Sequence, residues 1–306
     1  MSKETEKIFK ELHERMANEN AEDMSEEDVD RLLQELIQKH NETGRVELTE
    51  DTAETSDDFL DLAQETENEV LALKYAKKAL KLDPDNLDAE LMIADLKAKD
   101  PLDYLDRLKK VVSHGTKIMK AQGYDTDEYI GDYWGFIETR PYMRAKLHYI
   151  NMLKSSGMIG RAIEECEDVL RLNENDNMGV RYILMHLYAF MEDEKKALAL
   201  YKKYGEYHES QILLPLSILY FKRGNTRKAV SYLEMLDKAN KDTKLFFKSI
   251  VNDELEKYID EMENFGYRPG SIEDLIVGFM ENSFLYDQIP LYLFWAAEQL
   301  KGKKSR

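Results

Sequence analysis

This sequence of 306 residues contains a single cysteine, Cys166, so it has no thiol pair for an intramolecular disulfide or a thiolate zinc cluster. We interpret Cys166 as a small buried apolar residue, because no histidine stands near it in the sequence to activate its thiol. Six prolines and 14 glycines are few, whereas leucine, glutamate, lysine and alanine are abundant. This composition favours helix throughout the chain.

Long apolar runs are also absent. The apolar stretch at residues 289–297 is less than half of the roughly 20 residues that cross a bilayer, and residues 1–9 lack the apolar core of a signal peptide. We therefore expect no membrane segment and a cytoplasmic protein. The sequence also lacks a His-Glu-x-x-His pair, a phosphate-binding glycine-rich loop and a Gly-x-Ser-x-Gly elbow. We predict that it is not an enzyme and binds no cofactor or metal.

Positive charge is scarce in the first quarter of the chain. Residues 1–70 contain 7 basic and 23 acidic side chains, whereas residues 71–306 contain 36 and 38, so the net charge of −18 arises almost entirely in the first part. An acidic segment repels phosphate backbones, which argues against a nucleic-acid partner. It is compatible with a basic protein partner.

Three stretches follow one pattern: a large residue, a turn residue four positions later, and an alanine five positions after that. They read Leu153/Gly157/Ala162, Tyr188/Glu192/Ala197 and Tyr220/Gly224/Ala229, offset by 35 and 32 residues. The offsets approach the period of about 34 residues of tetratricopeptide repeats, which are pairs of antiparallel helices joined by a tight turn. The large residue fills the space between the paired helices, and alanine allows their backbones to approach closely.

Helical periodicity outside these stretches divides the chain into three parts. Residues 1–45 are predicted to form an acidic amphipathic helical arm, whose Val29, Leu33 and Ile37 we expect to stack on the helices of residues 59–82. The polar stretch 46–58 is the predicted linker. Residues 59–306 are predicted to form the third part, a tetratricopeptide-like, right-handed helical-repeat solenoid with an all-α fold.

Two segments of this solenoid depart from the repeat. Residues 115–140 form a predicted insert, rich in acidic and aromatic residues, that breaks the period. Residues 271–300 contain an apolar helix followed by basic residues, and we interpret them as C-terminal capping helices.

Three sequence blocks carry a resemblance to a known family. They are WGFIETRPYMRA at residues 134–145, GMIGRAIEECEDVLRLNENDNMGVRYIL at residues 157–184 and YRPGS at residues 267–271. Together they resemble the tetratricopeptide-type proteins of the suppressor-of-tumorigenicity-seven family and its bacterial relatives, over residues 60–300. The resemblance implies a helical-repeat fold and intracellular binding or scaffolding, with no catalytic residues to transfer. Some bacterial relatives carry a cysteine-rich zinc-binding tail, which this sequence lacks, so no metal or nucleic-acid role is carried over.

The first helices of such repeats line a concave face that commonly binds a partner segment. Arg140, Arg144 and His148 are spaced one helical turn apart, and Arg181 opens the first helix of the next repeat. We therefore predict a non-catalytic protein-protein interaction module, a scaffold or adaptor of unassigned oligomeric state, with a protein or peptide partner of basic character as one option. The groove candidates are Arg140, Arg144, His148, Asn151, Arg181, Tyr182, His186 and Phe221.

Two alternatives compete with this groove. The arginines can pair internally with Glu138, Asp176 or backbone carbonyls, since an arginine buried between repeats must be paired. Residues 124–148 can instead form the site of an enzyme or small-anion sensor, with bidentate arginine contacts to a carboxylate or phosphate. An enzyme or anion sensor would be favoured by a pocket in which Arg140, Arg144 and Asp132 converge without pairing with one another. An interaction module would be favoured by an open groove beside arginines that are paired.

Overall fold

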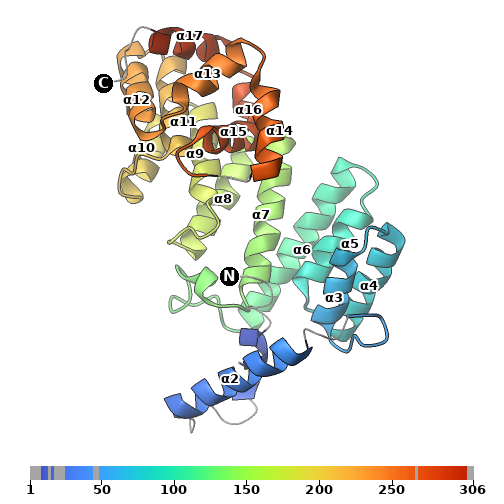
Figure 1. Cartoon of the computed structure of the whole chain (residues 1–306). Coiled ribbons are helices and arrows are strands. Elements are labelled where there is room, and N and C mark those ends of the chain that lie inside the picture. Colours follow the sequence, from blue (N-terminus) through green and yellow to red (C-terminus); the bar gives the residue numbers. More distant parts are fainter. Residues whose placement is uncertain (1–7, 13–14, 17–24, 44–47, 266–267, 302–306) are drawn as a thin grey trace. The chain divides into compact units, whose positions relative to one another are not determined.

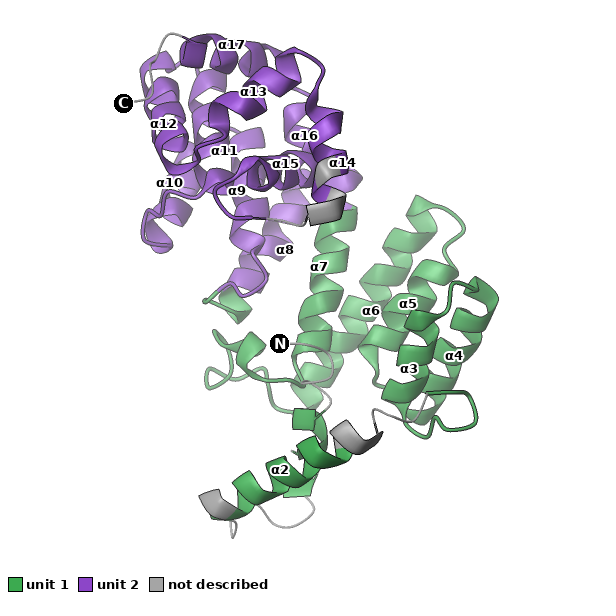
Figure 2. Cartoon of the chain, viewed as in Figure 1, with its two compact units in different colours: residues 1–152, 171–175 green, residues 153–170, 176–306 purple. Residues whose placement is uncertain are grey.

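The computed structural model describes residues 8–12, 15–16, 25–43, 48–265 and 268–301, and no strand occurs among them. The chain divides into two compact units (Figures 1 and 2). Unit 1 comprises residues 1–152 and 171–175, and unit 2 comprises residues 153–170 and 176–306. Within each unit, helices reverse direction at short turns, which confirms the predicted all-α helical-repeat fold.

Unit 1 is built from consecutive helices with strong local start signals. Its helices are α2 (Glu26–Thr43), α3 (Ser56–Glu65), α4 (Glu69–Leu82), α5 (Leu87–Leu96), α6 (Pro101–Ala121) and most of α7 (Arg140–Ser155). The N-cap side chains of α3 to α6 each accept a hydrogen bond from a first-turn amide; they are Thr55, Asn68, Asn86 and Asp100. Helix α3 packs against α4, α4 against α5, and α5 against α6.

Unit 2 contains most of α8 (Ile159–Leu172) and all later helices. These are α9 (Val180–Phe190), α10 (Glu194–Lys203), α11 (Ser210–Lys222), α12 (Thr226–Ala239), α13 (Thr243–Val251), α14 (Leu255–Phe265), α15 (Ile272–Glu281), α16 (Ser283–Tyr286) and α17 (Pro290–Lys301). Helix α9 pairs with α10 and α11 pairs with α12, while α9 and α11 pack against each other. This is the arrangement expected for successive two-helix repeats. Helix α17, in the predicted capping region, packs against α13.

The three turns aligned in the sequence share one geometry. The turn residues Gly157, Glu192 and Gly224 have φ angles of 70°, 58° and 71°, all in the left-handed region. In each turn, the amide of the following residue donates to the carbonyl of the large residue, at 2.9, 3.0 and 2.8 Å. This is the Schellman geometry that closes a helix. The three alanines are fully buried, so the repeat alignment is confirmed.

A fourth turn of the same kind follows α13. Asp253 has a φ of 59°, and the Glu254 amide donates to the Ser249 carbonyl at 2.7 Å. The sequence pattern missed this turn because Ser249 stands where the other three have a large residue. Tyr258 also replaces the alanine five positions after the turn residue.

Each unit contains, among its described residues, a buried serine–asparagine pair, which we call the Ser–Asn clasp. In unit 1, Asn86 Nδ2 donates to Ser56 Oγ at 2.9 Å; in unit 2, Asn240 Nδ2 donates to Ser210 Oγ at 3.0 Å. Each asparagine follows its serine by 30 residues, and each serine is the first residue of a helix. The clasp therefore joins the start of one helix to the segment that follows the end of the next helix: α3 and α4 in unit 1, and α11 and α12 in unit 2.

The predicted linker is partly packed on unit 1. Leu48 and Ala53 pack against the core cluster formed by α3 to α5. The Glu50 carboxylate accepts hydrogen bonds from Lys74 and Lys78, which lower its pKa to about 2. Helix α3 starts at Ser56, before the expected residue 59, because Thr55 and Asp58 form a reciprocal capping box.

The insert is shorter than expected, because α6 continues to Ala121 and includes Gly115. A Cβ at Gly115 would lie 2.5 Å from Tyr142 Cδ2, so the glycine allows the tyrosine ring to pack against the helix. Residues 122–139 form the non-helical insert, apart from one turn of 3-10 helix. Three of its rings, Tyr124, Tyr129 and Phe136, pack together with centroids 4.9 to 6.1 Å apart.

The described residues of the arm bury their apolar side chains against one another. Leu12, Leu32 and Leu36 form a buried cluster, against which Leu33 packs. Leu33 thus packs within the arm, whereas we expected it to stack on residues 59–82, because apolar side chains of residues 8–16 and of α2 cover one another. The arm also carries a polar contact to α3, in which Lys10 Nζ lies 3.1 Å from Asp57 Oδ2.

Candidate functional site

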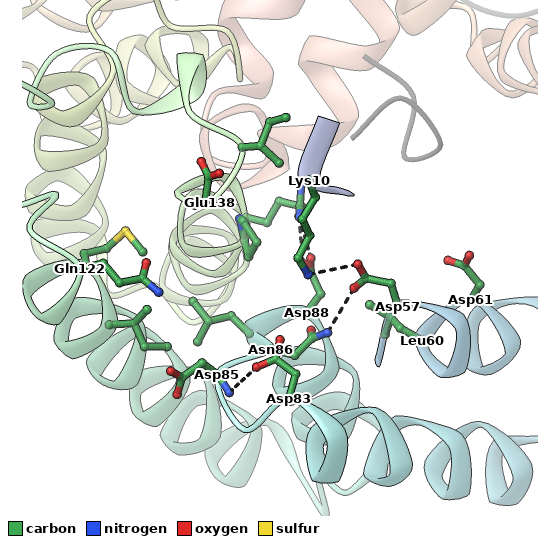
Figure 3. Close-up of a pocket in the computed structure, with 16 residues that line it drawn as sticks. Lys10, Asp57, Leu60, Asp61, Asp83, Asp85, Asn86, Asp88, Gln122 and Glu138 are labelled. Atoms are coloured by element: carbon green, nitrogen blue, oxygen red, sulfur yellow. Dashed lines mark hydrogen bonds and ion pairs between the residues drawn. The ribbon is translucent and has the colours of Figure 1, made fainter. Parts of the chain in front are cut away.

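Unit 1 contains a cavity of about 280 Å³, which we call the unit 1 cavity (Figure 3). Side chains from the arm, α3, the α4–α5 turn, α5, α6, the insert and α7 line it. Its apolar lining consists of Leu60, Leu87, Ile118, Met119, Ile137 and Pro141. The other ten lining residues are polar or charged, so the cavity offers both apolar contacts and charge.

The charged lining of this cavity is predominantly negative. Among the described residues that line it, six carry carboxylates and two carry cations. The carboxylates belong to Asp57, Asp61, Asp83, Asp85, Asp88 and Glu138, and the cations belong to Lys10 and Arg144. The cavity therefore favours a positively charged ligand group.

The backbone and neighbouring side chains fix several of these carboxylates. Asp57 lies in the first turn of α3, where the positive end of the helix dipole favours a carboxylate. Its Oδ1 is 3.5 Å from Asn86 Nδ2, on the residue that also caps α5. Asp83 Oδ1 accepts the Asp85 amide at 3.1 Å, and Asp85 Oδ1 lies 3.5 Å from His114 Nε2. The cavity thus has a preformed negative wall at the α4–α5 turn.

Arg144 lines the cavity and forms a two-point contact with Asp88. The Arg144 Nε to Asp88 Oδ1 distance is 2.9 Å, and the Nη2 to Oδ2 distance is 2.6 Å. Both side chains are about three-quarters buried. Such bidentate pairs hold the guanidinium in a fixed plane, so Asp88 orients Arg144.

Arg140 lies inside unit 1, with 5% of its surface exposed. Its Nε donates to the Trp134 carbonyl at 2.9 Å, and its guanidinium carbon lies 5.4 Å from the centroid of the Trp134 ring. Arg140 therefore anchors the insert to the start of α7, which is the internal pairing with a backbone carbonyl considered from the sequence.

Arg181 lies in unit 2 within a network of acidic and aromatic groups. Its Nη1 is 3.0 Å from Asp176 Oδ2, and its Nη2 is 3.0 Å from Glu209 Oε1. The Tyr182 hydroxyl donates to the same Glu209 oxygen at 2.8 Å. Burial of Tyr182, and to a smaller extent this hydrogen bond, raise the pKa of its hydroxyl. The pairing of Arg181 with Asp176 is also an alternative that the sequence left open.

The remaining groove candidates differ in exposure. His148 and Asn151 are exposed on α7 in unit 1. In unit 2, His186 is fully buried, and Phe221 packs against Tyr292 and Trp295 at centroid distances of 5.4 and 4.9 Å. Burial does not fit the assignment of His186 to an open groove, since a partner segment would have no access to its ring.

Of the eight groove candidates, only Arg144 lines the unit 1 cavity. The others are divided between unit 1 and unit 2. Sequence reasoning missed Asp57, Asp83 and Asp88. Asp57 falls in the stretch 46–58 that we predicted as a linker, although it lies in the acidic first turn of α3. Asp83 begins the Asp-Pro-Asp-Asn run of residues 83–86, which is typical of a turn between helices and gives no sign of a cavity.

Three further properties bear on the chemistry of the chain. In the ranges that the structure describes, no group of three or more histidine, cysteine, aspartate or glutamate side chains is arranged to hold a metal ion. No described helix combines the length and apolarity needed to cross a membrane. Cys166 is fully buried, and burial raises the pKa of its thiol, as its interpretation as an apolar core residue requires.

Comparisons with known proteins assign no family to the chain. No protein-family model matches it, and no curated protein matches it. Seven chains of solved structures match. One is titled "Crystal structure of MamA protein": it is 20% identical, the TM-score is 0.43, and the match covers 62% of this chain and 94% of that chain. Likeness of this degree carries no argument about function, and the resemblance to the suppressor-of-tumorigenicity-seven family stays a hypothesis.

Proposed function

We propose that the chain is a non-catalytic protein-interaction module that binds a segment of a partner protein in the unit 1 cavity. The observation that carries this proposal is the lining of that cavity. Apolar side chains such as Leu60 and Ile118 stand beside six carboxylates among the described lining residues. A basic amphipathic segment offers both kinds of group that this lining favours.

The state of the arginines supports an interaction module over a small-anion sensor or enzyme. Arg144 is held by Asp88, and Arg140 donates to a backbone carbonyl. A carboxylate or phosphate ligand would have to displace Asp88 within a lining that already carries excess negative charge. The buried Cys166 suits the reducing cytoplasm in which we place the protein.

Site-specific photo-crosslinking tests this function. A photoreactive side chain at Gln122, an exposed residue that lines the cavity, should form adducts with a partner protein in cell lysate. The same side chain at Lys109, which is exposed elsewhere on α6, serves as the matched control. We expect adducts at residue 122 only, and we expect Asp61→Asn together with Asp85→Asn to reduce them.

The competing function is tested with inorganic phosphate and citrate as probes in isothermal titration calorimetry. The interaction module predicts no saturable binding of either anion. Saturable binding that disappears in Arg144→Gln, together with equal adduct yields at residues 122 and 109, would contradict our proposal and favour the anion sensor.

A further inference from the structure

A lysine of the chain itself already lies in the unit 1 cavity. Lys10 lines the cavity, and its Nζ is 3.1 Å from Asp57 Oδ2 (Figure 3). The Lys10 side chain is 41% exposed and that of Asp57 is 28% exposed. The ammonium group therefore reaches the cavity from a separate segment, the arm. Its contact with Asp57 shows that a primary amine fits beside the carboxylates of the lining.

Hydrogen bonds from neighbouring residues hold the receiving side of this contact. Asn86 Nδ2 contacts both Ser56 Oγ and Asp57 Oδ1, at 2.9 and 3.5 Å, while Asn86 Oδ1 accepts the Ala89 amide. Asp57 is thus held by the Ser–Asn clasp of unit 1 in addition to its place in the first turn of α3. Its carboxylate needs little ordering when a cation binds, which favours association.

The arm as a whole is a poor electrostatic match for this cavity. Residues 8–43 contain eleven acidic and four basic side chains, and the cavity lining is itself negative. The ion pair of Lys10 with Asp57 is partly exposed, and such pairs stabilise weakly. A segment with several cations would interact more favourably with the same carboxylates.

We propose that Lys10 is an internal occupant of the unit 1 cavity and that a basic amphipathic segment of a partner protein displaces it. This inference rests on the proposed function. A lysine or arginine of the partner takes the place of Lys10 on Asp57, and apolar side chains of the partner contact the lining at Leu60 and Ile118. The arm then competes with the partner for the cavity, so the partner binds more weakly than it would to a chain without Lys10.

The probe is a fluorescent peptide that copies residues 3–17 with its four glutamates replaced by glutamine. Its affinity for the full-length chain is measured by fluorescence anisotropy. Lys10→Glu replaces the attraction to Asp57 with repulsion, and we expect it to tighten peptide binding about three- to tenfold. Asp57→Asn combined with Asp61→Asn should weaken binding at least about tenfold, because the carboxylates at the α3 side of the cavity are lost.

Lys39→Glu is the matched control. Lys39 is also an arm lysine, and its Nζ lies 2.9 Å from Glu11 Oε1 within the arm. We expect this variant to bind the peptide within about twofold of the unmodified chain. Circular dichroism of each variant verifies that α3 to α6 remain folded.

The remaining outcomes separate the two proposals. If Lys10→Glu binds like the unmodified chain while the double aspartate variant loses binding, the cavity is a partner site and internal occupancy by Lys10 is overturned. If no variant binds the peptide, or if the double aspartate variant binds it undiminished, the cavity does not receive basic segments. Both proposals then fail.

Discussion

His186 Nε2 and the Tyr286 hydroxyl lie 3.0 Å apart, although 100 residues separate them in the chain. His186 Nδ1 is 2.7 Å from the Tyr182 carbonyl oxygen, so Nδ1 carries the proton and Nε2 accepts from Tyr286. The ring is fully buried, and burial lowers the pKa of His186 to about 4. The neutral imidazole therefore joins α9 to α16 inside unit 2.

This contact predicts a loss of stability in mild acid. Because the folded pKa lies below the unfolded value of about 6.5, only the unfolded chain binds a proton on His186 as the pH falls from about 6.5 towards 4. Between pH 7 and pH 5, the unfolding free energy of the wild-type protein should fall about 2 kcal/mol further than that of His186→Gln. Urea unfolding at both pH values measures the difference, and parallel losses in the two proteins would contradict the prediction.

The left-handed turns predict opposite effects for two reciprocal substitutions. Gly224→Ala should cost about 1 kcal/mol, because a Cβ there meets no atom within 4 Å and the cost arises from the φ of 71° alone. Glu192→Gly should raise stability by up to about 1 kcal/mol, since it relieves the φ of 58° at the equivalent position. Glu192→Ala is the control, because it removes the carboxylate without freeing the backbone. Chemical denaturation of the variants decides the issue; equal stability of Glu192→Gly and Glu192→Ala would be incompatible with backbone strain.

The Ser–Asn clasp predicts a similar cost in both units. Asn86→Ala and Asn240→Ala each leave a buried serine hydroxyl without its donor. Asn86→Ala also removes the N-cap contact with the Ala89 amide, and Asn240→Ala also removes the donor of the Ser271 carbonyl, which lies at 2.8 Å. We expect a loss of about 2 kcal/mol for each. Asn252→Ala, at an exposed position, should change stability by less than about 0.5 kcal/mol. Thermal denaturation provides the measurement, and a clasp variant as stable as Asn252→Ala would show that the buried pair is dispensable.

The Arg144–Asp88 pair predicts measurable coupling. A double-mutant cycle with Arg144→Gln and Asp88→Asn should give about 1 kcal/mol, because two parallel contacts fix the geometry of both groups. The pair Arg107–Asp103 is a control, with a single contact of 3.0 Å one helical turn apart, and should give about 0.3–0.5 kcal/mol. Coupling near zero for Arg144 and Asp88 would mean that Asp88 does not hold the guanidinium, and the anion-binding alternative would gain support.

The repeat architecture was predictable because its determinants are local. A glycine or glutamate at the end of one helix and an alanine nine positions after a large residue encode a turn whose hydrogen bonds span only six residues. The fourth turn, at Asp253, escaped the pattern because backbone geometry was retained while Ser249 and Tyr258 replaced the usual side chains. The same backbone turn therefore forms without the large residue and the alanine of the other three.

The candidate site was less predictable because its contacts span long separations. Asp88 and Arg144 are 56 residues apart, and Lys10 and Asp57 are 47 apart. Helical spacing correctly placed Arg140, Arg144 and His148 on one helix, yet it could not show that the first is buried, the second is paired and the third is exposed. These differences depend on which neighbouring segments pack against α7. The spacing of residues along a single helix does not show this.

The Ser–Asn clasp has a consequence for how the helix pairs are closed. In residues 56–86 of unit 1 and in residues 210–240 of unit 2, a serine that opens a helix is joined to an asparagine 30 residues later. Both partners of each clasp belong to the same two-helix stretch, so the contact that holds the two ends of each helix pair together is contained within that pair.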